Sequence, residues 1–235
     1  MLNMNRHKNS VTSLGIAAKP VLSFHLYKDN SDNRAKAENA VKKIFRSAYG
    51  ADINSYLPCL LTAELDDNIA AVVGVRRAID QRLFLEKYLS TPIETAVSKT
   101  SGVIISRVNL VEIGNLVSCK AGISRQLFII LTFALAKAEI EWVSFTATAQ
   151  VEQLLSKLSL STIVVGQATE KAIINGKDNW GSYYVNCPNV CVGNVLNAVN
   201  ELNKSSVFIK MAQQHAATID LLAKQIKSSS HRVNT

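Results

Sequence analysis

One segment of the chain combines a carboxylate with a glycine-containing loop, a combination suited to proton transfer beside a bound phosphate group. Glu112 lies in the β-branched stretch Val103–Val117, and the small-residue loop after it carries Gly122 and Ser124. A carboxylate that faces a cleft can take a proton, directly or through a water, from an amine nucleophile. Free backbone N–H groups at the start of a helix can bind phosphate oxygens. A site of this kind can hold a phosphate-bearing substrate, such as an acyl-coenzyme A thioester, beside a proton acceptor, and would suit direct attack by an amine without a covalent enzyme intermediate.

Glu112 also has a purely structural interpretation. A glutamate on a buried strand can pair with an arginine, and the candidates are Arg76, Arg77 and Arg107. The sequence leaves both roles open.

Other residues are candidates for the same reaction. Glu86 lies in a segment with alternating apolar residues and can bind the ammonium group of the acceptor, or can serve only the structure. Tyr184, or its neighbour Tyr183, can donate the proton that a departing thiolate needs. Cys119 is a competing nucleophile that we rank low, because no histidine stands near it in the sequence to activate its thiol.

The predicted donor site covers the end of the central strand and the loop after it. Asn115 can hydrogen-bond the thioester carbonyl or the pantetheine arm, and Arg125 adds a cation suited to a phosphate. Many strand–helix turns contain glycine, so an ordinary turn is the alternative. The predicted donor-binding residues are Asn115, Leu116, Val117, Lys120, Ala121, Gly122, Ile123, Ser124 and Arg125.

Composition and charge narrow the remaining function classes. The 235 residues, 48% hydrophobic and 19% charged, suit one sizeable globular domain. The net charge of +8 suits a polyanionic cofactor, a nucleic acid or an anionic membrane, and alone it decides among none of them. We expect no nucleic-acid partner. Cys187 and Cys191 lack a second cysteine or histidine pair at zinc-ligand spacing, so no metal site is predicted.

The sequence also bears on location. No apolar run reaches the roughly 20 residues of a membrane helix, and the N-terminus is a poor secretory signal. We therefore expect a cytoplasmic protein with reduced cysteines.

The elements that must position these residues follow from local patterns. Apolar residues at helical spacing predict a first helix from Ser31 or Asp32 to Gly50. An antiparallel hairpin and a short helix after Pro92 follow it. The stretch Val103–Val117 reads as one long strand, or two with a bulge near Gly114. A helix over 121–138 and a strand over 142–148 complete a crossover, which predicts a parallel strand pair. A further helix over 151–158 and a strand over 162–165 come next.

Three regions are expected along the chain. Residues 1–30 form a flexible arm, residues 31–190 the catalytic domain, and residues 191–235 a helical basic tail. The tail can pack on the domain or on a partner, and its lysines leave peripheral membrane contact open. Deletion after about Ser205 is expected to leave a soluble protein.

The order of elements resembles the GNAT superfamily, whose phosphate loop follows a Gln/Arg-x-x-Gly-x-Gly/Ala pattern. Cys119–Ser124 fills this pattern, with Cys119 departing from the Gln/Arg and Ser124 from the final Gly/Ala. Leu155–Leu160 looks like the family's Tyr-Glu-Lys-Leu-Gly-Phe segment, with Leu155 where the tyrosine general acid would sit. The resemblance implies an α/β (α+β) fold, with a mixed sheet, an antiparallel N-terminal part and a parallel pair at splayed central strands.

A closer resemblance, over roughly 35–195, is to the bacterial thermostable hemolysin family. The segments that carry it are 46–51, 83–89, 111–116, 141–148 and 180–184. That family is GNAT-like and similar to acyl-homoserine-lactone synthases, whose central strand carries Glu-x-Ser-Arg. Here Glu112 matches, but Gly114 and Asn115 replace the serine and arginine, so the lactone product is not implied.

The resemblance implies an N-acyltransferase that moves an acyl group, which we expect to be a fatty one, to a small amine acceptor. The expected co-substrate is an acyl-coenzyme A or acyl-carrier-protein thioester. Two alternatives stay open: a membrane-active lytic protein without catalysis, and an inactive scaffold that binds thioesters. The sequence does not fix the oligomeric state.

Overall fold

The computed structural model describes residues 21–28, 31, 33–79, 81–120, 122–173 and 178–228. Residues 1–20, the larger part of the expected arm, lie outside this part of the chain, as do Ala121 and residues 229–235. Within the expected arm, Leu22–Lys28 forms an edge strand, β1.

The protein is built on a seven-stranded mixed sheet in the order β1-β2-β3-β4-β5-β7-β6. The parallel pair predicted at the centre is confirmed as β4 with β5, and the other neighbouring strands pair antiparallel. After β1 the strands are β2 (Cys59–Leu65), β3 (Asn68–Arg77), β4 (Leu110–Ser118), β5 (Trp142–Ala147), β6 (Ile163–Gln167) and β7 (Asn189–Asn194).

The hairpin of β2 and β3 is confirmed, and its turn explains the pairing. Asp66 and Asp67 both have positive φ, 49° and 61°, a conformation that matches the twist of a two-stranded hairpin. β2 is buried along nearly its whole length, because helices cover both faces of the sheet beside it.

Helix α1 (Arg34–Tyr49) covers one face of the sheet. Ala37, Val41 and Phe45 are buried at four-residue spacing, and Gly50 ends the helix with φ of 65°. The same face carries the 3₁₀ turn η1 (Phe84–Tyr88) and α2 (Ile93–Ser101), which pack on residues of β5 and β7.

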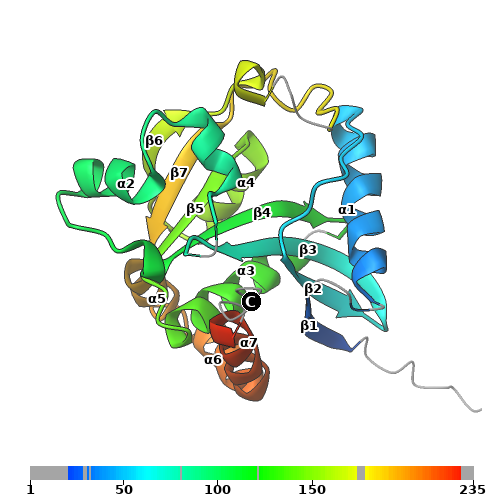
Figure 1. The fold of residues 1–235 in the computed structure, drawn as a ribbon. Coiled ribbons are helices and arrows are strands. Elements are labelled where there is room, and N and C mark those ends of the chain that lie inside the picture. The colour runs from blue at the N-terminus through cyan, green and yellow to red at the C-terminus, as the bar shows by residue number, and fades with distance from the viewer. Residues whose placement is uncertain are drawn as a thin grey trace, which may run out of the picture.

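Helix α3 (Ile123–Lys137) covers the other face together with the C-terminal helices. These are α5 (Val195–Leu202), α6 (Ser206–Gln214) and α7 (Ala216–Ser228). Figure 1 shows α3 and these three helices gathered below the sheet, with α1 at the right and α2 at the left. The remaining elements are α4 (Ala149–Lys157) and the 3₁₀ turns η2 (Arg107–Asn109) and η3 (Glu170–Ile173).

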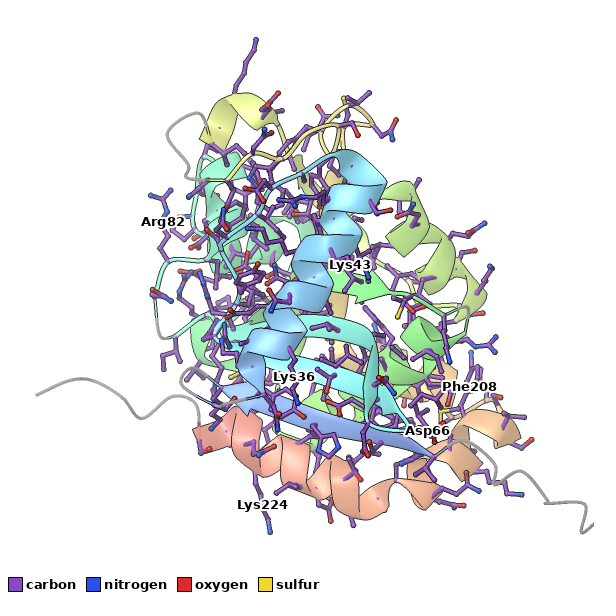
Figure 2. All side chains as sticks on the ribbon, turned by 90° about the vertical axis from the view of Figure 1, so that its right-hand side faces the viewer. Lys36, Lys43, Asp66, Arg82, Phe208 and Lys224 are labelled. Atoms are coloured by element: carbon purple, nitrogen blue, oxygen red, sulfur yellow. The ribbon has the colours of Figure 1, made fainter. Side chains whose placement is uncertain are left out.

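The tail is part of the core rather than an appendage. Ile219, Leu222 and Ile226 of α7 are buried in the same cluster as α3. Its basic residues face outward: Figure 2 shows Lys224 projecting away from the molecule. The expected boundary at residue 190 falls inside β7.

Two other expectations differ from the structure. The predicted strand over Val103–Val117 starts only at Leu110, because η2 precedes it and residues 103–106 are not in a strand. β7 lies where the sequence indicated only a passage to the helical tail.

Candidate active site

The candidate site lies where the two parallel strands separate. β4 and β5 pair at Leu110–Glu112 and Trp142–Ser144 only. Beyond Glu112, β4 stays paired with β3, whereas β5 stays paired with β7. Figure 1 shows the consequence: β4 runs beside β3, and β5 leaves with β7 in another direction. The sheet therefore opens on the C-terminal side of Glu112.

A bulge in β4 near Gly114, one of the two alternatives that the sequence left open, helps to open the sheet. In the register with β3, Gly74 faces Gly114 and Val72 faces Val117, so β4 holds one more residue between these pairs. Asn115 lies in this bulge with φ of 49°. A bulge bends its strand and increases the local twist.

The side chain of Asn115 holds the bulge in place. Its Oδ1 accepts a hydrogen bond of 2.8 Å from the backbone N–H of Leu57. A Cβ on Gly74 would lie 2.9 Å from this same Oδ1 and 2.9 Å from the Leu57 Cβ. Gly74 therefore leaves the room that Asn115 and Leu57 occupy.

A cavity of about 450 Å³ lies between the separated strands β4 and β5. Its walls include Glu112–Ser118 of β4, Phe145 and Thr146 of β5, and Phe128 of α3. This volume lies within the range of roughly 300–1,000 Å³ that is typical of small-molecule sites. The cavity thus joins the separated strands to the helix that follows β4.

Aromatic side chains form one wall of this cavity. Neighbouring rings lie at centroid distances such as 5.8 Å for Phe84 and Trp180 and 5.3 Å for Tyr49 and Tyr183. The Tyr49 hydroxyl also donates to Gln150 Oε1 at 3.1 Å, which links α1 to α4 beside the cavity. The members of this aromatic wall are Phe45, Tyr49, Phe84, Tyr88, Trp180, Tyr183 and Tyr184.

Glu112 is buried at the point where the strands part and lines the cavity. Its two carboxylate oxygens accept hydrogen bonds from the backbone N–H groups of Phe84, at 3.0 Å, and Leu85, at 2.9 Å. Arg76 Nη1 lies 3.9 Å from Oε2. Burial raises the pKa of Glu112 above its ordinary value, and the two backbone donors offset only part of that effect. A raised pKa makes this carboxylate a better proton acceptor.

Glu86, the second predicted carboxylate, has a different environment. It is buried outside the cavity lining, and Arg107 binds both of its oxygens, at 2.6 and 2.9 Å. The backbone N–H groups of Leu83 and Ile93 donate to them as well. Burial raises the pKa of Glu86, but these hydrogen bonds outweigh it and the pKa is lowered. The structure therefore gives Glu86 the role of joining η1, α2 and η2.

Tyr184 lines the cavity and its hydroxyl lies 2.5 Å from that of Tyr88. Burial raises the pKa of Tyr184 to about 12, so its phenol stays protonated near neutral pH and can act as a proton donor. Leu155, at the position of the GNAT tyrosine, is buried in the core on α4 and offers no proton.

The predicted donor-binding residues divide into two groups. Asn115, Leu116, Val117 and Ser124 line the cavity. The others in the described part of the chain do not: Lys120 and Arg125 are exposed, Gly122 is half-buried and Ile123 is buried.

The loop after β4 leads directly into α3 through a glycine. Gly122 precedes α3 with φ of 83°, a conformation that side chains rarely adopt. Ser118 Oγ donates to the carbonyl of Lys120 at 2.9 Å. These contacts place the start of α3 beside the cavity, where Ser124 reaches the lining. Ala121 lies outside the described residues.

Sequence reasoning missed part of the site. Arg76 appeared only as a possible partner of Glu112, and Phe84 and Tyr88 did not appear as cavity residues. Their positions depend on the register between β3 and β4 and on the packing of η1, which the local sequence does not reveal.

Neither a metal centre nor a membrane-spanning helix is found among the described residues. They contain no group of three or more His, Cys, Asp or Glu side chains placed to hold a metal ion. In that same part of the chain, every helix is too short or too polar to cross a membrane.

Solved structures share this architecture at low sequence identity. FeeM, an N-acyl amino acid synthase from uncultured soil microbes, matches with a TM-score of 0.56 and 12% identity, over 79% of this chain and 96% of FeeM. The AHL synthase LasI gives 0.52 and 10%, over 75% and 91%. BjaI, a CoA-dependent acyl-homoserine lactone synthase with SAM and isopentyl-CoA, gives 0.52 and 10%, over 88% and 90%. The expected GNAT-like fold, with its parallel pair at splayed strands, is confirmed.

Sequence comparison identifies the family. No curated protein matches the chain significantly. The family model described as thermostable hemolysin matches residues 27–199, well over half of the 235 residues, and spans the bulged strand, the cavity and the aromatic wall. The chain therefore belongs to the thermostable hemolysin family.

Proposed function

We propose that this protein is an N-acyltransferase that moves an acyl group from an acyl-coenzyme A or acyl-carrier-protein thioester to a small amine. The observation that carries the proposal is the cavity between β4 and β5, with the buried carboxylate of Glu112 in its wall. A carboxylate of raised pKa beside such a cavity is suited to accept the proton of an amine.

The donor enters beside the start of α3 in this proposal. Ser124, in the first turn of α3, lines the cavity, and its side chain and the positive end of the helix dipole are suited to an anionic or carbonyl group. The aromatic wall and Phe128 offer apolar surface for an acyl chain, which favours a fatty acyl group over acetyl. The fold likeness to FeeM and to BjaI, which was solved with isopentyl-CoA, supports acyl transfer in general.

The proposed transfer needs no reactant other than the thioester and the amine. The ammonium of the acceptor gives one proton to Glu112, and the resulting amine attacks the thioester carbonyl carbon. As the C–N bond forms, the C–S bond breaks and the thiolate leaves. Tyr184 donates a proton to that thiolate and regains one from the nitrogen through water, while the proton on Glu112 passes to solvent.

A second candidate, a scaffold that binds thioesters without turnover, is favoured by one observation. Both oxygens of Glu112 already accept backbone hydrogen bonds, as a purely structural carboxylate would. We also propose that the protein acts in the cytoplasm, where acyl thioesters are made.

The test incubates the purified protein with acyl-coenzyme A of increasing chain length and a mixture of primary amines. Release of free thiol together with an amide product found by mass spectrometry supports the transferase. Tight thioester binding, seen as a rise in Tm, without thiol release at any chain length would support the scaffold instead.

A further inference from the structure

Arg76 is the cross-strand partner of Glu112 and belongs to the same cavity. The two residues face each other in the register of β3 and β4, so their side chains lie on the same face of the sheet. Arg76 lines the cavity, and its side chain is only 17% exposed. A cation thus lies beside the carboxylate that we propose as the base.

The hydrogen-bond donors of Arg76 are largely unused. Its Nη1 lies 3.9 Å from Glu112 Oε2, which is too long for a hydrogen bond. The Glu112 oxygens already accept from Phe84 and Leu85. Nε of Arg76 is buried and has no partner within the described part of the chain. Because buried donors are rarely left unpaired in proteins, this group points to a ligand.

The neighbouring arginines differ from Arg76 in their position and their partners. Arg77 also has a buried Nε without a partner in the described part of the chain, but it lies outside the cavity lining and its Nη2 donates to the carbonyl of Val108 at 2.6 Å. Arg107 is occupied by Glu86 and Glu94. Among the described residues of this region, Arg76 is therefore the cation that is available to a molecule in the cavity.

We propose that Arg76 binds the carboxylate of the acceptor, and that the acceptor is an α-amino acid. This rests on the proposed acyl transfer and names its substrate class. An α-amino acid carries its ammonium and its carboxylate on one carbon, so its two charges are as close together as those of Arg76 and Glu112. The ammonium faces Glu112, which takes its proton, while the guanidinium fork of Arg76 binds the carboxylate.

Arg76 and Glu112 also fix the orientation of the bound amino acid. With its carboxylate held on β3, the amino group of the ligand lies over β4, where the opened strand faces the thioester. The side chain of the ligand meets only the Phe84 and Trp180 part of the aromatic wall, since Phe84 donates its backbone N–H to Glu112 and its ring lies beside Trp180. The rest of the wall and Phe128 remain for the acyl chain. The site therefore both selects the acceptor and positions its nitrogen.

The experiment is an internal competition. The protein is given one acyl-coenzyme A that it uses, with an equimolar mixture of L-amino acids and their carboxamides. The carboxamides keep the amine and the side chain but lose the negative charge. We expect acylated amino acids to exceed acylated carboxamides by about 100-fold or more, because a site built for a polar group rejects ligands that lack it.

Variants assign the preference to Arg76. Arg76→Gln should bring the product ratio close to one and raise KM for the amino acid, with thioester affinity unchanged. Arg76→Lys keeps the charge but not the fork and should retain an intermediate preference. Arg77→Gln is the matched control and should behave like the parent.

The outcomes separate this inference from the proposed function. Equal acylation of amino acids and carboxamides by the parent would overturn the inference and leave the transferase intact. A preference that persists in folded Arg76→Gln would also overturn it. If no amine is acylated, the transferase itself fails. A rise in the parental Tm with amino acids but not with carboxamides, lost in Arg76→Gln, would then still support the carboxylate site.

Discussion

Replacement of Glu112 by glutamine separates a catalytic base from a structural carboxylate. The substitution keeps the side-chain shape and removes the proton acceptor. Only one of its two terminal atoms can still accept a hydrogen bond, so either Phe84 or Leu85 loses its partner. An unpaired buried N–H costs about 1–3 kcal/mol.

The lower end of this range is expected, because burial already disfavours the ionised carboxylate, as its raised pKa indicates. A loss of about 1 kcal/mol lowers the Tm of a domain of this size by about 2–4 °C. The protein should therefore remain folded at assay temperature.

The catalytic effect should be much larger than this change in stability. Loss of a general base typically costs a factor of about 10²–10⁴ in rate. In the parent, kcat/KM should rise with pH through a pKa above the ordinary 4.5, because the base acts only when ionised. This acid limb should be absent from Glu112→Gln.

The assay measures thiol release, thioester affinity and Tm on one preparation of each protein. Glu86→Gln is the matched control: it is the same substitution at a buried carboxylate outside the cavity lining, and it should lose stability but keep its rate per folded molecule. Transfer by Glu112→Gln at the parental rate across the pH range would refute the role of Glu112 as base.

Three other predictions concern stability and the donor loop. Because the pKa of Glu86 is lowered, its pairing with Arg107 stabilises the protein above about pH 4.5, and this stabilisation is lost as the pH falls through the lowered pKa. In urea unfolding, the difference in unfolding free energy between the parent and Glu86→Gln should therefore shrink in acid. Deletion after Ser205 should give insoluble protein on expression, contrary to the expectation from sequence. The deletion removes buried α7 residues whose burial contributes about 1.5–3 kcal/mol each to stability. A soluble product with the parental Tm would contradict this prediction. Gly122→Val should lower Tm and weaken thioester binding, because a valine is strained at φ of 83°. A clash is not the cause, since a Cβ at this position meets no described atom within 4 Å. Equal ligand-induced Tm shifts in mutant and parent would exclude this loop from the donor site.

Much of the fold could be predicted because local patterns determine it. The spacing of Ala37, Val41 and Phe45 with Gly50 defines α1, and Asp66 and Asp67 define the hairpin. The strand–helix–strand order then implies the parallel pair. β1 and β7 could not be read in this way, because one is half-exposed at the edge and the other follows an irregular segment.

The site residues show the same limit. Glu112 was identified because a lone carboxylate in an apolar strand is conspicuous. Nothing local distinguishes it from Glu86, whose partner Arg107 lies 21 residues away in sequence. Arg76 becomes a candidate site residue only through the β3–β4 register, which sets it opposite Glu112. Contacts between residues far apart in the sequence, not residue type, distinguish these side chains.

The packing of α7 on α3 has a consequence for how the protein is made. α3 ends at Lys137 and is buried around nearly its whole circumference, whereas α7, which covers part of it, ends only at Ser228. During translation α3 leaves the ribosome long before its cover exists, and such exposed apolar surface invites aggregation. A stop codon early in α7 would yield a polypeptide that carries every candidate site residue, Glu112 included, but lacks the cover that α3 needs to fold around them.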